Sequence, residues 1–226
     1  MTGQPHHRGA AWGPGVPSES RWPASVAVLA GLVLYMSLPG RLIVGPWWLV
    51  PVLELALLVP LSIVAPRRFF GESRARRIAA IVIIAVLNAA NVMSLALLVN
   101  YLVSHPTATP GVRLLISAAK LWLTNIIVFS LWYWELDRGG PDERMSDEHK
   151  APDFLFPQMV TPGCAPRGWG PAFADYLYLS LTNSMAFSPA DTMPLSRWAK
   201  VLMGLEAMVS LLIIALVASR AVGILG

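Results

Sequence analysis

The chain has 226 residues, of which 55% are hydrophobic and 13% charged, whereas a typical soluble domain carries about 25% charged residues. Its 17 basic residues exceed its 13 acidic ones, but the arginines stand between apolar runs and not on a polar, aromatic-rich surface, which argues against nucleic acid as a partner. One cysteine and four scattered histidines exclude an intramolecular disulfide and give no metal-ligand spacing. Composition therefore predicts an all-α, polytopic transmembrane helical bundle surrounded by lipid, with no metal and no cofactor.

Residues 1–23 are polar and rich in Gly, Pro and Ser, and we expect a disordered tail there and not a cleaved signal peptide. Residues 24–135 contain four apolar stretches, which predict a four-helix transmembrane region. A helix needs about 20 apolar residues to cross a bilayer, so the first stretch is long enough only if it continues through Arg41 toward Val44. The four stretches cover residues 24–39, 47–65, 78–103 and 113–134.

The second half of the chain is organised differently. Residues 136–170 are polar and rich in Pro and Gly, which indicates an extramembrane segment without a core of its own. Within it, the run Phe154-Leu155-Phe156 is a candidate to dock on the membrane surface or on the bundle. Residues 171–226 combine a short amphipathic helix, a polar break and a long apolar helix over 195–224. The whole pattern predicts about five spans plus one short helix, over 171–188, that is either re-entrant or a sixth span.

Five arginines between the second and third apolar stretches determine the expected orientation: Arg67, Arg68, Arg74, Arg76 and Arg77. Short loops rich in Lys and Arg stay in the cytoplasm, so this loop and the 136–170 segment are both expected on the cytoplasmic side. On the same rule, the Trp132-Tyr133-Trp134 run predicts an aromatic belt at one interface, and Trp47 with Trp48 predicts a belt at the other.

Three charged side chains within the apolar stretches are candidates for function: Glu54, Lys120 and Glu206. A charge inside the membrane needs a partner or water. Glu206 is expected to be protonated, paired with Lys120, or turned toward a hydrated cavity, and a purely structural pair is as consistent with the pattern as a functional site. The motifs of common enzyme classes are absent, so we expect no catalytic activity.

A polar break between two helices supplies the candidate pore-lining residues. These are Thr182, Asn183, Ser184, Ser188 and Asp191. The order of elements resembles the pore module of the potassium-channel superfamily, in which an outer helix, a pore helix, a filter and an inner helix follow one another. Thr182, Asp191 and Pro194 match the end of the pore helix, the residue after the filter, and the start of the inner helix. The GYG filter is missing, so the resemblance does not imply potassium selectivity.

A second resemblance covers the chain from about residue 131 to its end. The runs LWYWELDRGGP, DFLFPQM and DYLYLSLTNSMAFSPADTMPLSRWAK are similar to those of bacterial integral membrane proteins without an established activity. This resemblance implies a multi-pass protein of a bacterial inner membrane. The sequence as a whole predicts passage of small cations with weak selectivity, through a homo-oligomer. The alternative is a membrane scaffold or regulator that acts through contacts between helices.

Overall fold

The computed structural model describes residues 20–43, 45–54, 73–104, 111–144, 151–161, 163–165, 169–186 and 191–225. Within these residues the chain is helical apart from short connections and one two-stranded ribbon, which confirms the all-α class. The long helices are α1 (Trp22–Met36), α3 (Ser73–Ser104), α4 (Gly111–Leu136), α7 (Phe173–Ala186) and α8 (Arg197–Leu225). The short elements are η1 (Gly40–Leu42), η2 (Asp137–Gly139), α5 (Pro141–Arg144), α6 (Pro157–Val160), β1 (Phe154–Leu155) and β2 (Met193–Pro194); residues 49–54 are also helical.

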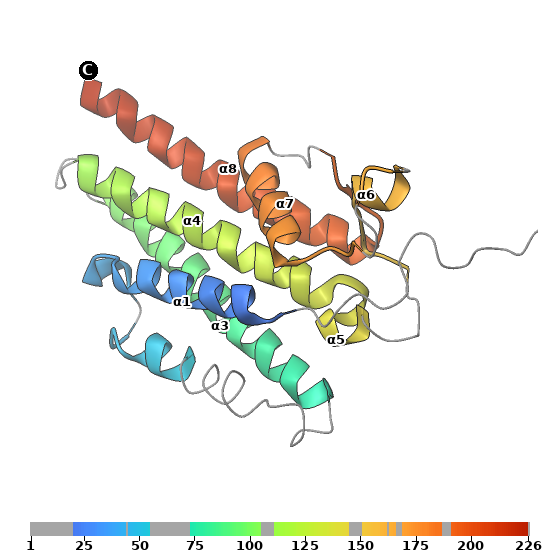
Figure 1. Cartoon of the computed structure of the whole chain (residues 1–226). Helices are drawn as coiled ribbons and strands as arrows, with labels where there is room; N and C mark the ends of the chain where they lie inside the picture. Colours follow the sequence, from blue (N-terminus) through green and yellow to red (C-terminus); the bar gives the residue numbers. More distant parts are fainter. Residues whose placement is uncertain are drawn as a thin grey trace, which may run out of the picture.

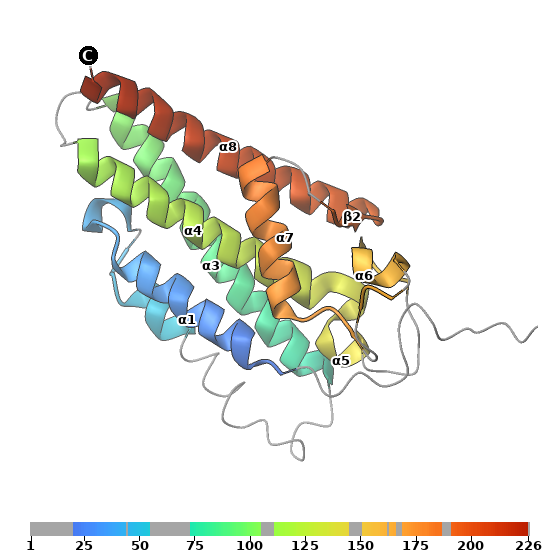
Figure 2. The ribbon, with the colours of Figure 1, turned by 45° about the horizontal axis from the view of Figure 1, so that its top comes forward.

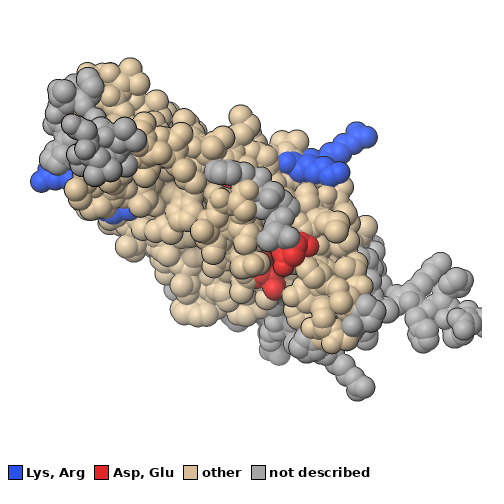
Figure 3. Space-filling model, turned by 90° about the horizontal axis from the view of Figure 1, so that it is seen from above, with Lys and Arg blue, Asp and Glu red and all other residues tan. Residues whose placement is uncertain are grey.

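Among the described residues, three segments are long and apolar enough to cross a membrane: Arg77–Ser104, Val112–Gly139 and Arg197–Ser219. Lys, Arg, Asp and Glu are sparse on the face drawn in Figure 3 and stand mainly toward its two ends, as expected for a surface that contacts lipid. These features support a membrane protein. The second apolar stretch of the sequence lies largely outside the described residues.

The first apolar stretch forms a shorter helix than expected. Helix α1 has 15 residues and ends at Met36, so the continuation through Arg41 that the first stretch needs to cross a bilayer as one helix is not formed. The backbone N–H of Ser37 closes the last turn with bonds of 3.0 Å to Val33 O and 3.2 Å to Leu34 O. Pro39 then stops the helix, since its ring disfavours helical backbone in the preceding residue and it has no N–H to donate.

Helix α4 is the centre of the fold, and α1, α3, α7 and α8 all pack against it (Figures 1 and 2). Two contacts show that α1 runs antiparallel to α4. Arg21, just before α1, lies 3.5 Å from Glu135 near the end of α4. Lys120, in the first half of α4, reaches the carbonyl of Ser37 just after α1. In both ribbon views α3 and α8 run in the same direction as α1.

The segment after α4 folds back and covers the end of the bundle. Phe154 is fully buried, and its ring lies 5.0 Å from Tyr133 and 5.7 Å from Trp198 between ring centroids. Phe156 packs 5.4 Å from Tyr176. The expected docking of this aromatic run is therefore confirmed, with the bundle as its partner. Strand β1 also pairs antiparallel with β2, Phe154 opposite Pro194 and Leu155 opposite Met193.

This docking corrects the expected aromatic belt at the end of α4. Tyr133 is 0% exposed and Trp134 is 3% exposed, so both belong to the core and not to a lipid interface. They are buried because Phe154 covers Tyr133, and Phe173 meets Trp134 at 6.0 Å between centroids. Trp47, by contrast, is 64% exposed, as a belt residue should be.

The chain leaves one end of the bundle along α7 and is back at the same end in β2. At its start, Tyr176 contacts Asp137, just beyond α4. Near its last turn, Ser184 reaches Ser210 in α8, which in turn contacts Asn125 of α4. Asn125 lies 12 residues, or about 18 Å, back along α4 from Asp137. Strand β2, which follows α7, is back at the first end of the bundle, where it pairs with β1 beside the start of α8.

Candidate functional site

Glu206 lies at the meeting point of α4, α7 and α8 and is 0% exposed. Helix α8 is mostly exposed, and its buried residues follow a single stripe at helical spacing. Among the described side chains of α8, the stripe consists of Ala199, Met203, Glu206, Ser210 and Ile213. A polar residue on this stripe faces the protein and not the surroundings, because residues three and four apart share a helix face. The sequence thus places Glu206 against the two helices that α8 contacts.

Four side chains donate hydrogen bonds to the carboxyl group of Glu206. Tyr133 Oη lies 2.5 Å from Oε2, and Asn183 Nδ2 lies 2.7 Å from the same oxygen. Ser184 Oγ lies 3.0 Å from Oε1, which also receives Ser180 Oγ. A buried carboxyl group is costly unless it is hydrogen-bonded. Here one donor comes from α4 and three come from α7, so the carboxyl group ties these helices to α8.

The polar contacts continue away from Glu206 toward the middle of α4. Ser210 Oγ donates to Ser184 Oγ at 3.0 Å, and Asn125 Nδ2 donates to Ser210 Oγ at 3.1 Å. Asn125, Ser184 and Ser210 are all fully buried. Asn183 also donates to the carbonyl of Met203 at 3.0 Å, so both hydrogens of its amide are used. We call the seven residues that share these contacts the Glu206 network: Asn125, Tyr133, Ser180, Asn183, Ser184, Glu206 and Ser210.

Lys120 is not part of the Glu206 network, and the expected pair between the two residues is not formed. Lys120 Nζ donates to the backbone carbonyl of Ser37 at 2.6 Å. That carbonyl lies just beyond α1, where the last carbonyls of a helix have no partner within the helix and attract a cation. Lys120 therefore stabilises the end of α1, and its partner is a backbone group that no charge pattern in the sequence reveals.

The candidate pore-lining residues that the structure describes lie in different surroundings. Asn183 and Ser184 are buried in the Glu206 network. Thr182 is half-buried, and its hydroxyl bonds the carbonyls of Tyr178 and Leu179 in its own helix, each at 3.0 Å. Asp191 is exposed, while Ser188 lies outside the described residues. The five candidates therefore do not share one surface.

Glu54 is the other buried carboxyl group among the candidates. It is 0% exposed, and neither of its oxygens has a hydrogen-bond partner among the residues that the structure describes. It is the last described residue before the gap at 55–72. In the described part of the chain no group of three His, Cys, Asp or Glu side chains could hold a metal ion.

A second polar cluster, which we call the Asp137 knot, lies where α4 ends. Tyr176 Oη donates to Asp137 Oδ2 at 2.5 Å, and the backbone N–H of Asp153 donates to Asp137 Oδ1 at 2.8 Å. Asp153 in turn accepts the backbone N–H of Arg138 at 2.9 Å. The knot therefore joins the end of α4, the docked segment and the start of α7.

Arg144 reinforces the Asp137 knot. Its Nη1 donates to the carbonyl of Trp134 at 2.7 Å and to that of Asp137 at 3.0 Å, and its guanidinium lies 5.3 Å from the ring of Tyr176. The backbone turns sharply here, with Arg138 at φ 54° and Gly140 at φ 101°. An arginine in left-handed backbone stores strain that its surroundings must compensate, and the hydrogen bonds at Arg138 and Asp137 contribute to that compensation.

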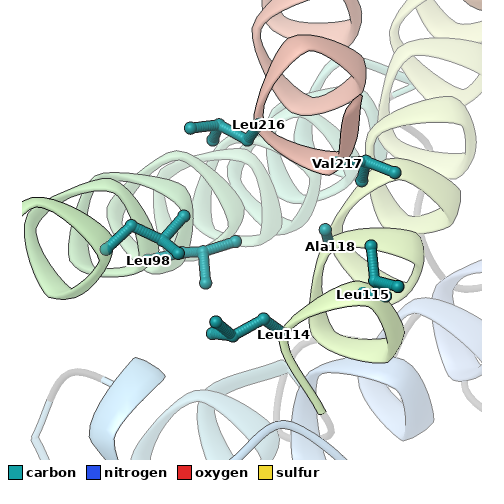
Figure 4. Close-up of a pocket in the computed structure, with 7 residues that line it drawn as sticks. Leu98, Leu114, Leu115, Ala118, Leu216 and Val217 are labelled. Atoms are coloured by element: carbon teal, nitrogen blue, oxygen red, sulfur yellow. The ribbon is translucent and has the colours of Figure 1, made fainter. Parts of the chain in front are cut away.

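An apolar pocket lies near the opposite end of the bundle, between α3, α4 and α8 (Figure 4). Its side chains are all aliphatic, so it offers no group that would hold an ion or a polar ligand. The lining residues are Leu98, Leu102, Leu114, Leu115, Ala118, Leu216 and Val217.

Sequence reasoning missed four members of the Glu206 network: Asn125, Tyr133, Ser180 and Ser210. Ser210 stands four residues after Glu206, which places both on one helix face and could have indicated a shared partner. The sequence around Tyr133 was misleading: an aromatic run is typical of a membrane interface, whereas Tyr133 is buried.

Comparisons with models of known protein families, with characterised proteins and with solved structures find no match for this chain. Neither resemblance noted in the sequence gains or loses support from them. The geometry of the two polar clusters is therefore the basis for any statement about function.

Proposed function

We propose that the protein passes small cations across a membrane with weak selectivity, through a path formed at the end of α7 in a homo-oligomer. The observation that carries this proposal is the course of the chain through α7. Helix α7 starts at one end of the bundle and ends at the level of Asn125, and β2 is back at the first end. Asn125 is close to the middle of the apolar segment Val112–Gly139. In a membrane with this segment as a span, α7 would be a re-entrant helix, and its course supports that alternative over a sixth span.

A re-entrant helix that ends in the membrane interior favours a cation there. The last four carbonyls of any helix lack partners within the helix, and the helix dipole adds a partial negative charge at that end. Half-helices use these groups to coordinate cations in transport proteins. Helix α7 has 14 residues and ends at Ala186, so its negative end would lie at the depth where a permeating cation has lost most of its water.

The path would lie on the outer side of α7 and not inside a single chain. Asn183 and Ser184, on the inner side, are buried by the Glu206 network. Met185 and Ala186 at the end of the helix are exposed, as is Asp191 further along the chain. A path bordered by this side needs neighbouring copies of the chain to close it, which is why the proposal includes a homo-oligomer. Asp191 from each copy would then form a ring of carboxylates that concentrates cations.

Cation flux into liposomes tests the proposal. Potassium and sodium should both pass, because the sequence between α7 and Asp191 has no glycine pair. Replacement of Asp191 by Asn should lower the flux several-fold at low ionic strength and much less at high ionic strength, where salt screens the ring. Asp175→Asn is the matched control, since Asp175 lies at the other end of α7 and bonds the backbone N–H of Ala172 at 2.8 Å. Folded protein that gives no flux at any voltage contradicts the proposal.

A scaffold or regulator is the second candidate function, and one observation favours it. The polar inner side of α7 is fully engaged with α4 and α8, which is the arrangement expected if polar side chains serve only to hold helices together. Under this alternative the reconstituted protein passes no cations, while the contacts of the Glu206 network still govern its stability.

A further inference from the structure

If Glu206 is ionised, the Glu206 network has one donor hydrogen fewer than its polar contacts require. Ser180 Oγ lies 2.8 Å from the carbonyl of Ile126 and also contacts Glu206 Oε1. Both neighbours are acceptors when the glutamate is ionised, but a serine hydroxyl has a single hydrogen to donate. One of the two contacts would then bring two oxygens together without a hydrogen between them.

The other members of the network cannot supply the missing hydrogen. Ser184 already donates to Oε1, and it accepts from Ser210, which accepts from Asn125. Asn183 uses both amide hydrogens, one for Met203 O and one for Oε2. Since both of these targets are acceptors, the nitrogen and oxygen of the Asn183 amide are assigned by the network itself. The remaining hydrogen must therefore belong to Glu206.

We propose that Glu206 is a proton-binding site, with Ser180 as the group that adjusts to the two states. In the loaded state Glu206 Oε1 carries the proton and donates it to Ser180 Oγ, while the Ser180 hydroxyl donates to the carbonyl of Ile126. When the proton leaves for water, the Oε1–H bond breaks and the carboxylate keeps the electron pair. Ser180 then turns its own hydrogen from Ile126 to Oε1. The charge of the network changes from zero to minus one.

The surroundings favour a proton over a metal ion. Among the described residues no ion pair includes Glu206, and a buried charge without a counter-ion is strongly disfavoured. The nearest groups present N–H and O–H hydrogens to the carboxyl oxygens at 2.5 to 3.0 Å. A metal ion would require lone pairs in their place. A proton neutralises Glu206 with no displacement of the packed helices.

Few other groups that gain or lose protons face this site. Tyr133 is the titratable neighbour from α4. On α7, Tyr176 is turned to Asp137 and Asp175 to the backbone of Ala172, while Lys200, on α8, is exposed. The site does not depend on cation passage, so its test uses no flux measurement.

Infrared difference spectroscopy of the reconstituted protein between alkaline and acidic buffer tests the proton site. We expect a carboxylic-acid C=O band that shifts in heavy water and is lost in Glu206→Gln. In Ser180→Ala the band should persist at higher frequency, because the acid loses the oxygen that accepts its proton. Ser219→Ala is the control and should leave the band unchanged, since Ser219 bonds only the carbonyl of Leu216 at 2.9 Å within its own helix.

The variants also separate a proton site from a purely structural contact. A structural role for Ser180 predicts lower stability in Ser180→Ala without any change in band frequency. If Glu206→Gln does not fold, Ser180→Ala and the wild-type spectrum still decide the matter. A wild-type spectrum without an acid band at any pH, or a band that Ser180→Ala leaves in place at the same frequency, overturns the proposal.

Discussion

The phenol of Tyr133 on α4 donates a hydrogen bond of 2.5 Å to the carboxyl group of Glu206 on α8, 73 positions further along the chain. This contact and the three partners from α7 hold three helices around one buried group. Hydrogen bonds between helices in a membrane contribute about 0.6 kcal/mol on average, and most O–H···O bonds in proteins have a length of about 2.7–2.8 Å. The shorter Tyr133–Glu206 bond is therefore expected to be among the stronger polar contacts of the fold.

Tyr133→Phe should lower the thermal stability of the detergent-solubilised protein by about 1–2 kcal/mol, because one buried donor is removed while the ring stays in place. Tyr178→Phe is the matched control: Tyr178 is 53% exposed, and the same loss of a hydroxyl there should change stability by less than about 0.5 kcal/mol. Equal effects of the two variants would show that the bond to Glu206 does not matter.

Lys120→Met and Glu206→Gln should have additive effects on unfolding. Lys120 bonds the carbonyl of Ser37, and Glu206 bonds side chains of α4 and α7, so the two residues share no partner. Changes at independent sites usually add to within about 0.5 kcal/mol. A double-mutant cycle with a larger coupling energy would restore the pair that the sequence suggested.

The single cysteine, Cys164, reports the orientation of the chain without any added label site. It is exposed, and its backbone N–H donates to the carbonyl of Thr161, just after α6, at 3.4 Å. Helix α6 lies at the end of the bundle where α4 stops and α8 starts (Figure 1). The arginine pattern predicts that this end is cytoplasmic. A membrane-impermeant thiol reagent should therefore leave intact bacteria unlabelled and label the protein in inverted vesicles.

A cysteine at the opposite end provides the complement. Val112 is 62% exposed at the start of α4, and Val112→Cys in a Cys164→Ser background should react in intact cells. Reaction of Cys164 from outside would reverse the orientation and place the loop of α7 on the outer side, as in the potassium-channel pore module.

Gly140→Ala should weaken the Asp137 knot. A Cβ at this position would lie 2.9 Å from the backbone carbonyl of Glu135, and the φ of 101° is one that other residues rarely adopt. The cost is of the order of 1–3 kcal/mol, and it should appear in thermal unfolding. Gly204→Ala is the control, because a Cβ there meets nothing within 4 Å and alanine favours a helix. Loss of stability in both variants would instead point to a contact of α8 with another copy of the chain.

Helices α3, α4 and α8 were predictable from sequence because their apolar runs are long. Expected bounds of 113–134 for the fourth stretch compare with Gly111–Leu136 for α4, and 195–224 for the last helix compares with Arg197–Leu225 for α8. The course of α7 was not predictable. Its return depends on the pairing of β1 with β2, which are 39 residues apart between Phe154 and Met193 and too short to leave a periodic signal.

The candidate site was predicted in part. Glu206 was singled out as a charge within an apolar stretch, and Asn183 and Ser184 as pore-lining candidates in a polar break; the structure brings the three together. Their partners were not recognised because tyrosine and serine occur at both buried and exposed positions. Only the packing of the helices decides which of these positions a given residue takes. Lys120 shows the same limit, since its partner Ser37 O is a backbone atom that every residue possesses.

The order of residues along the chain also bears on how the protein is made. Helix α7 leaves the ribosome before α8, so Ser180, Asn183 and Ser184 exist for a time without Glu206, the group that accepts their hydrogen bonds. A helix with that many unpaired polar groups is poorly soluble in lipid. We therefore expect α7 to pack into the bundle only after α8 has been made.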